Sequence, residues 1–178
     1  MDKRQFIKQS VAGAVALGTA GKMGTAFART NDELSTKVTT SIKRTLGKTG
    51  FEVFPVVYGG IVSSRDGQAA SDNYVAWAID RGINYFDVAP SYGDAEEKLG
   101  ISLKPFRKDN YLACKTTIRA RIEAEKEFEE SLRLLQTDYF DLFQLHSLTA
   151  PEDVDKAFSA DGVIEMIEKK NNVAEFVK

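Results

Sequence analysis

The chain has 178 residues, of which 43% are hydrophobic, and its formal net charge is −2; this composition is typical of a globular domain. Because acidic and basic residues are interspersed and nearly balanced, no nucleic-acid-binding surface is predicted. A single cysteine, Cys114, excludes an intrachain disulfide and a cysteine-based metal site, and a single histidine, His146, excludes a multi-histidine zinc site. No metal site is therefore expected.

Residues 1–28 have the pattern of an export signal. A basic start at Lys3–Lys8 is followed by an apolar run of small residues, and Ala26-Phe27-Ala28 provides an A-x-A cleavage site. The start resembles a twin-arginine signal with lysine in place of the first arginine. We expect a bacterial periplasmic protein with no stable membrane anchor, the alternative being a disordered or helical tail. Residues 29–41, rich in Asn, Asp, Ser and Thr, are predicted to be a linker.

The chain after the linker begins with a predicted hairpin. Apolar and polar residues alternate over 42–46 and 51–54, around a four-residue loop bounded by glycines. The apolar run Pro55–Tyr58, which ends at Gly59-Gly60, is predicted to form a first buried strand. Ser71 is the expected N-cap of the helix that follows.

Three further apolar runs predict three more strands, each followed by a helical pattern. The strands are expected at Gly82–Phe86, Tyr111–Lys115 and Tyr139–His146. The apolar faces of the helices are expected to carry Val75, Ala78, Ile79 and Gly82; Ala124, Phe128, Leu132 and Leu135; and Val163, Met166 and Ile167. On the second of these helices Glu129 and Arg133 have the spacing of an i,i+4 ion pair. Strict alternation of strands and helices predicts a parallel α/β sheet with right-handed crossovers.

Polar side chains stand at the ends of three successive predicted strands. These are Asp87, Lys115 and His146, and Tyr92 lies in the loop just beyond Asp87. Because side chains alternate along a strand, these residues share one face, whereas the face toward the helices is expected to hold Phe86, Cys114 and Leu145. In parallel α/β folds the carboxyl ends of the strands are where chemistry takes place. We therefore expect the four polar groups to converge.

Their convergence would create a proton donor. A phenol is a weak acid at neutral pH, but an adjacent ammonium stabilises the phenolate, and a carboxylate can hold that ammonium in place. Tyr92 is thus predicted to protonate a carbonyl oxygen as that oxygen gains charge. Taken singly, a loop tyrosine, a strand-end lysine, a capping aspartate and a core histidine are ordinary features, so the prediction depends on their common position. A Schiff-base role for Lys115 is an alternative, although it leaves Tyr92 and His146 without a function.

Four segments resemble the aldo-keto reductase family. They are Arg44–Gly50, Gly82–Asp87, Ala89–Gly93 and Leu132–His146. The resemblance implies that Tyr92 is the general acid/base, that Lys115 and Asp87 tune it, and that His146 orients the substrate. It also implies a nicotinamide cofactor, usually NADPH but also NADH, and small-molecule aldehyde or ketone substrates. Among the residues after the first strand, Gly59 and Gly60 are the candidates for a cofactor contact.

By this resemblance, residues 42–178 are expected to form the N-terminal half of a (β/α)8 TIM barrel, preceded by a β-hairpin. A complete barrel has eight strand–helix units, and four are visible here. The alternative to a reductase is therefore a truncated, inactive fragment or an interaction module. In either case the open edges of a four-stranded sheet predict self-association.

Overall fold

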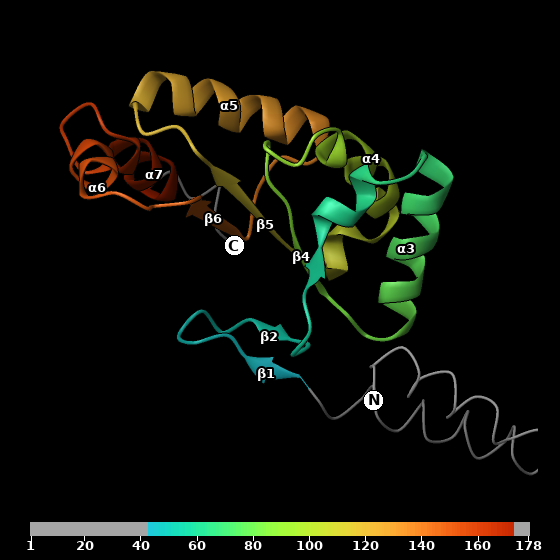
Figure 1. Cartoon of the computed structure of the whole chain (residues 1–178). Helices are drawn as coiled ribbons and strands as arrows, with labels where there is room; N and C mark the ends of the chain where they lie inside the picture. The colour runs from blue at the N-terminus through green and yellow to red at the C-terminus, as the bar shows by residue number, and fades with distance from the viewer. Residues whose placement is uncertain (1–42, 173–178) are drawn as a thin grey trace, which may run out of the picture. The chain divides into compact units, whose positions relative to one another are not determined.

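The computed structural model describes residues 43–172 (Figure 1). The predicted export signal and the predicted linker lie outside these residues. The strands belong to two sheets. Strands and helices follow one another along the chain in the order β1 Arg44–Thr45, β2 Glu52–Val53, β3 Tyr58–Gly59, η1 Gly60–Ser64, α3 Gln68–Asp80, β4 Tyr85–Asp87, α4 Ala95–Leu103, η2 Lys104–Asp109, β5 Tyr111–Thr116, α5 Arg121–Leu134, β6 Leu142–Leu145, α6 Pro151–Ala157 and α7 Val163–Asn172. Over this part of the chain no helix has the length and apolar character that crossing a membrane requires.

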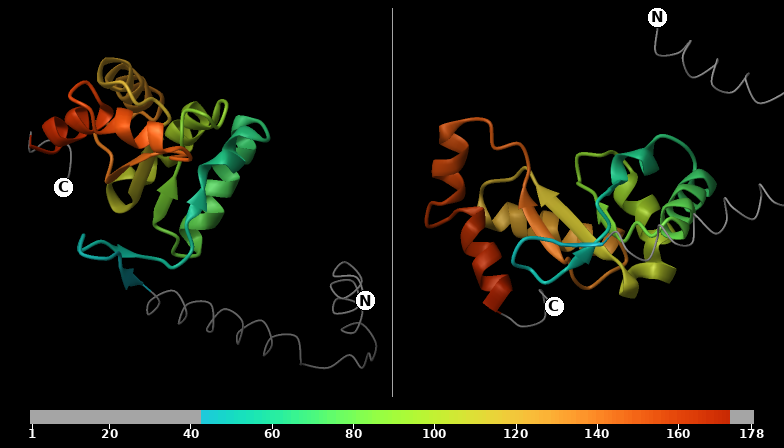
Figure 2. Two further views of the ribbon diagram at one scale, coloured as in Figure 1. Left: turned by 60° about the vertical axis from the view of Figure 1, so that its left-hand side comes forward. Right: turned by 90° about the horizontal axis from the view of Figure 1, so that it is seen from below.

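Four parallel strands form the main sheet, in the order β3-β4-β5-β6, as the strict alternation predicted. In this order every strand lies beside its neighbour in the sequence, which is the arrangement of consecutive units in a barrel. The register places Gly59 opposite Asp87, Asp87 opposite Ala113, and Lys115 opposite Gln144. Helices α3, α4 and α5 lie along one face of the sheet (Figures 1 and 2).

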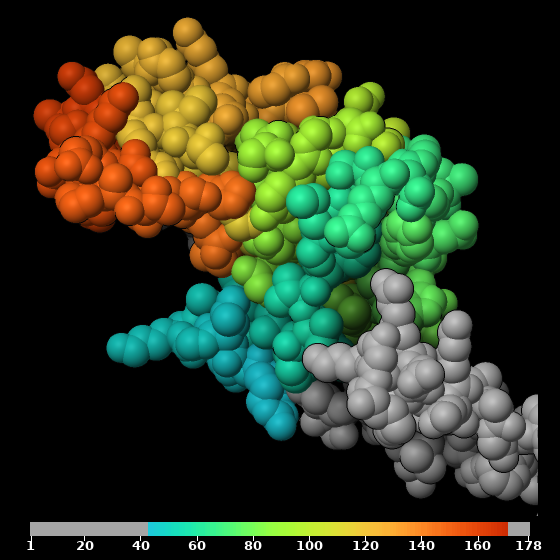
Figure 3. Space-filling model, in the orientation of Figure 1, coloured from blue at the N-terminus to red at the C-terminus, as the bar shows by residue number. Residues whose placement is uncertain are grey.

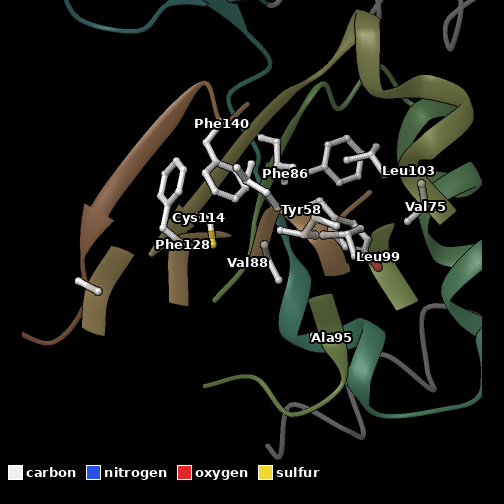
Figure 4. Packing of buried hydrophobic residues seen from close by; sticks show 14 of the residues in the cluster. Tyr58, Val75, Phe86, Val88, Ala95, Leu99, Leu103, Cys114, Phe128 and Phe140 are labelled. Atoms are coloured by element: carbon white, nitrogen blue, oxygen red, sulfur yellow. The ribbon is translucent and has the colours of Figure 1, made fainter. Parts of the chain in front are cut away.

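The larger hydrophobic core lies between these helices and the sheet (Figure 4). The sheet contributes Phe86 and Cys114, both fully buried, and Leu145 packs against the same cluster. The alternation predicted for these three residues is therefore confirmed. The helix residues in this core include Val75, Ala78, Ala124, Phe128, Leu132, Leu135, Val163 and Met166, with Ile79 and Ile167 packed against them.

A smaller core lies on the opposite face of the sheet, beneath the predicted hairpin. Strands β1 and β2 pair antiparallel, which confirms the hairpin. Val53 packs with Tyr85 and Ala113, and the ring of Phe51 stacks on that of Tyr111 at 4.5 Å. Since Tyr85 and Tyr111 begin β4 and β5, the hairpin covers the amino ends of the strands (Figure 1). In the space-filling view the hairpin is seen at the lower left of the coloured surface (Figure 3). The carboxyl ends are thus left for the predicted site.

The first strand predicted over Pro55–Tyr58 exists, and Tyr58 is buried in it, but the strand is shorter than predicted. Strand β3 comprises only Tyr58 and Gly59, and Val56 and Val57 are 56% and 42% exposed. The physical reason is the position of β3 at the edge of the described sheet, where only β4 pairs with it. An apolar run alone cannot reveal which of its residues another element covers.

Three local predictions about helices also need correction. Helix α3 begins at Gln68 after Gly67, so Ser71 is not its N-cap but lies inside the helix, buried and 2.9 Å from the hydroxyl of Ser102. Gly82 does not belong to the helical face, because its φ of +80° turns the chain toward β4.

The expected pair of Glu129 and Arg133 is absent from the ion pairs of α5. Arg133 instead binds Glu130, which is one residue nearer along the helix, at 2.5 Å. Glu129 accepts a hydrogen bond from Lys170 of α7 at 2.6 Å. The partner of Glu129 thus comes from a helix that is distant in the sequence.

Candidate active site

The four predicted site residues lie at the carboxyl ends of adjacent strands. Asp87 is the last residue of β4, Lys115 is the penultimate residue of β5, and His146 directly follows β6. Its amide nitrogen donates to the Thr116 carbonyl at 2.8 Å, which continues the pairing of β5 and β6 to this point. Tyr92 is in the loop after β4, just before Gly93, whose φ of +65° favours glycine.

Lys115 is the centre of the group. Its ammonium nitrogen lies 2.5 Å from Oδ2 of Asp87 and 3.3 Å from the hydroxyl of Tyr92. It also donates to the carbonyl of Val88 at 3.5 Å. The side chains of Lys115 and Asp87 are 12% and 26% exposed to solvent. The pair therefore lies below the surface but within reach of a ligand.

His146 lies against the same tyrosine. The rings of Tyr92 and His146 meet edge to face, with centroids 5.7 Å apart and planes at 87°. Nδ1 of His146 is 3.4 Å from the hydroxyl of Ser91. The structure therefore brings together all four residues that were predicted from the sequence. Ser91 was not predicted as a site residue, although it immediately precedes Tyr92.

The two glycines after β3 differ in their surroundings. A Cβ atom on Gly60 would lie 2.7 Å from the carbonyl oxygen of Asp87, so close packing on β4 accounts for this glycine. Gly59 is exposed, and a Cβ atom there would meet no atom within 4 Å. Of the two, only Gly59 has open space around its Cα.

Two polar side chains near the site, one buried and one half-buried, were not predicted as site residues. Arg119, which follows β5, is 6% exposed and binds the backbone at the end of β6. Gln144 lies opposite Lys115 in the sheet, and its Oε1 atom is buried with no hydrogen-bond partner. Arg119 lies outside the four segments that resemble the family, and Gln144 lies inside Leu132–His146. The surroundings of both side chains are created by the pairing of β5 with β6.

Behind the sheet, on the helix side, lies a second polar pair. The thiol of Cys114 is 3.5 Å from Oε1 of Glu96, which is 4% exposed. Burial raises the pKa of the Glu96 carboxyl above its ordinary value, and burial raises the pKa of the Cys114 thiol. A buried neutral thiol is a poor nucleophile. The location confirms the prediction that Cys114 is a packing residue.

The arrangement can position and donate a proton. A phenol within hydrogen-bond distance of an ammonium, itself held by a carboxylate, has the composition of a general acid with a stabilised conjugate base. Among the residues from 43 to 172, no group of three His, Cys, Asp or Glu side chains is placed to hold a metal ion.

Comparison with known proteins identifies a matching protein family and several curated relatives. The model of the aldo/keto reductase family matches residues 60–172. Aldo-keto reductase YhdN of Bacillus subtilis is 36% identical over 104 residues, which are 49% of this chain and 31% of that protein. L-galactose dehydrogenase of Arabidopsis thaliana is 35% identical over 120 residues, which are 59% of this chain and 38% of that protein. The matches thus span between three and four tenths of the length of these curated relatives.

Solved structures show the same likeness over more of the chain. A putative aldo-keto reductase from Pseudomonas aeruginosa superposes with a TM-score of 0.68 at 26% identity, covering 78% of this chain and 58% of that one. The aldo-keto reductase from Klebsiella pneumoniae, in complex with NADPH, gives a TM-score of 0.61 at 25% identity, covering 76% and 48%. The hairpin and the four strand–helix units therefore correspond to the N-terminal half of the barrel in these proteins.

Proposed function

Because this chain belongs to the aldo/keto reductase family, we propose that its site reduces the carbonyl groups of small aldehydes and ketones with a nicotinamide cofactor. The observation that supports this most directly is the position of the Lys115 ammonium, 2.5 Å from Asp87 and 3.3 Å from the Tyr92 hydroxyl. The presence of NADPH in the Klebsiella pneumoniae relative supports the choice of cofactor. The names of two relatives, L-galactose dehydrogenase and 6-dehydroglucose reductase, favour a sugar or a similar polyol as substrate.

Tyr92 is the proposed proton donor. Its hydroxyl transfers a proton to the carbonyl oxygen as negative charge develops there. Lys115 then donates its hydrogen bond to the phenolate that remains, and Asp87 keeps the ammonium in place throughout. Because these charges are fixed before the reaction begins, little reorganisation is needed when the proton moves.

His146 is the proposed orienting group. If the Ser91 hydroxyl donates to Nδ1, the proton of the neutral imidazole is on Nε2. Nε2 then donates a hydrogen bond to the same carbonyl oxygen that receives the proton of Tyr92. The edge-to-face contact of the two rings keeps both donors on one side of the substrate.

The described residues fit one end of a nicotinamide cofactor. The open space at Gly59, which pairs with Asp87, would leave room for a cofactor to contact this residue, whereas the packed Cα of Gly60 would not. When bound, the cofactor supplies a hydride to the carbonyl carbon. Gly59 is therefore the residue of this chain that we assign to the cofactor, and Asp87, Tyr92, Lys115 and His146 are assigned to the proton and the substrate.

The test is oxidation of NADPH and NADH by the full chain with a panel of aldehydes, ketones and oxidised sugars. Tyr92→Phe is expected to lower kcat by about 10²–10⁴-fold while cofactor binding is retained. Tyr74→Phe is the matched control, because Tyr74 is exposed on α3 and its hydroxyl binds Asp66, away from the site. Equal turnover by wild type and Tyr92→Phe would refute the assignment of the proton donor.

A second candidate function is that of an interaction module. An exposed apolar surface favours it. Val56, Val57 and Trp77 are 56%, 42% and 55% exposed and border a cavity of about 740 Å³ beside β3. In the described sheet β3 has one strand partner, so its free edge can pair with a second copy. Light scattering after size-exclusion chromatography tests this: a dimer that Val57→Asp converts to a monomer supports it, and a monomeric wild type contradicts it.

A further inference from the structure

Arg119 lies at the junction of the two loops that leave β5 and β6. Its Nη2 atom donates to the carbonyl of His146 at 2.6 Å and to that of Ser147 at 3.2 Å, and Nη1 donates to the carbonyl of Thr116 at 3.2 Å. One guanidinium group thus joins the last residue of β5 to the residue that carries the imidazole of the proposed site.

The position of Arg119 is costly for a charged side chain. It is 6% exposed, and its Nε atom makes no hydrogen bond. The nearest carboxylate, Asp153, lies 3.7 Å from Nε and is 37% exposed, so it offsets the buried charge poorly. Burial of a charge without a close, well-aligned counterion reduces stability. An apolar residue could fill the same volume at lower cost, which indicates that the hydrogen bonds themselves are needed.

These hydrogen bonds fix the backbone on both sides of the His146 side chain. The amide of His146 binds Thr116, and its carbonyl binds Arg119. Ser147 has a φ of +56°, a conformation that L-residues rarely adopt and that costs free energy. The hydrogen bond from Arg119 to the Ser147 carbonyl stabilises that conformation.

We propose that Arg119 is a positioning residue, which holds the backbone at His146 and Ser147 so that the imidazole remains at the Tyr92 ring. Its role in the reaction rests on the function proposed above, whereas its effect on the orientation of His146 does not. The hydrogen bonds of Arg119 go to the carbonyls of Thr116, His146 and Ser147 rather than to Tyr92 or Lys115, so it acts on the site through His146.

His146 is the only histidine in the chain, so its imidazole can be observed directly by NMR. The full chain, labelled with ¹³C,¹⁵N-histidine and carrying no histidine tag, is expected to give one set of imidazole signals and a nuclear Overhauser effect to the Tyr92 ring. Arg119→Met is expected to shift these signals toward those of free histidine and to remove the Overhauser effect. Arg119→Lys, which can still donate to a carbonyl, is expected to show a smaller change.

Arg121→Met is the matched control. Arg121 lies two residues away and has its closest carboxylate, that of Asp161, at 3.9 Å, with no side-chain bond to His146. Its replacement is expected to leave the His146 signals unchanged. If wild type turns over substrate, Arg119→Met is also expected to lower kcat by about 10–100-fold with the KM for cofactor unchanged.

The NMR result decides the proposal even if the chain shows no turnover. Unchanged His146 signals in a folded Arg119→Met variant would overturn it. If that variant does not fold, the Arg119→Lys variant decides. A shift of the His146 signals in Arg119→Lys, with no shift in Arg121→Met, supports the proposal. Unchanged His146 signals in Arg119→Lys overturn it. Failure of the proposed function appears separately, as absence of turnover in a wild type whose His146 still contacts Tyr92.

Discussion

Replacement of Lys115 by methionine tests the electrostatic centre of the site. The change keeps most of the side-chain volume but removes the charge 2.5 Å from Asp87. The Asp87 carboxylate then loses its counterion in a place where water reaches only 26% of its side chain. The folded state should therefore be destabilised, and the proton donor should lose its partner.

The size of the effect follows from the burial of the pair. Ion pairs on the surface contribute about 0–1 kcal/mol, and breaking a fully buried pair costs about 3–5 kcal/mol. With 12% and 26% exposure the pair lies between these limits, so we expect a loss of about 1–3 kcal/mol in the free energy of unfolding. For a domain of this size, that loss lowers Tm by about 4–12 °C.

The assay is urea denaturation followed by far-UV circular dichroism at pH 7, with thermal melts in parallel. The double variant Asp87→Asn, Lys115→Met removes the uncompensated charge and should recover at least half of the lost stability. Arg133→Met, which breaks the exposed pair with Glu130, should leave the urea midpoint unchanged. If Lys115→Met has the same midpoint as wild type, the pair is not a desolvated one, and the electrostatic reasoning for the site is wrong.

Three other outcomes are expected. Burial holds the pKa of the Glu96 carboxyl above its value in the unfolded chain, so ionisation of this group costs stability as the pH rises above the ordinary carboxyl range. Glu96→Gln should therefore stabilise the protein against urea at pH 7 but not at pH 4, and an equal gain in stability at both pH values would contradict this. Gly100→Ala places a Cβ 2.3 Å from the carbonyl of Leu134 and should cost about 1–3 kcal/mol in urea denaturation, whereas Gly67→Ala, with open space, should not. If the first 28 residues direct export, protein isolated from a bacterial periplasm should begin at Arg29 on amino-terminal sequencing, and an intact Met1 on cytosolic protein would refute this.

The sequence by itself determined the order of the strands and predicted which polar side chains meet at their carboxyl ends. Strands such as Tyr111–Thr116 were recognisable because their apolar runs are local and continuous. The convergence of Asp87, Lys115 and His146 was predictable because parallel neighbours bring their carboxyl ends to one edge, and side-chain alternation then assigns a face. Both inferences need only short-range pattern and a general rule of topology.

The tertiary structure alone decided which side chains meet across long sequence separations. Glu129 binds Lys170 rather than Arg133, Arg119 reaches the carbonyl of His146, and Val57 remains exposed at a sheet edge. No local pattern encodes these outcomes, because each depends on how closely two separately formed elements approach and on what water is excluded between them. Local propensity fixes the elements, whereas the distances between charges, and hence the chemistry of the site, arise only when the elements pack.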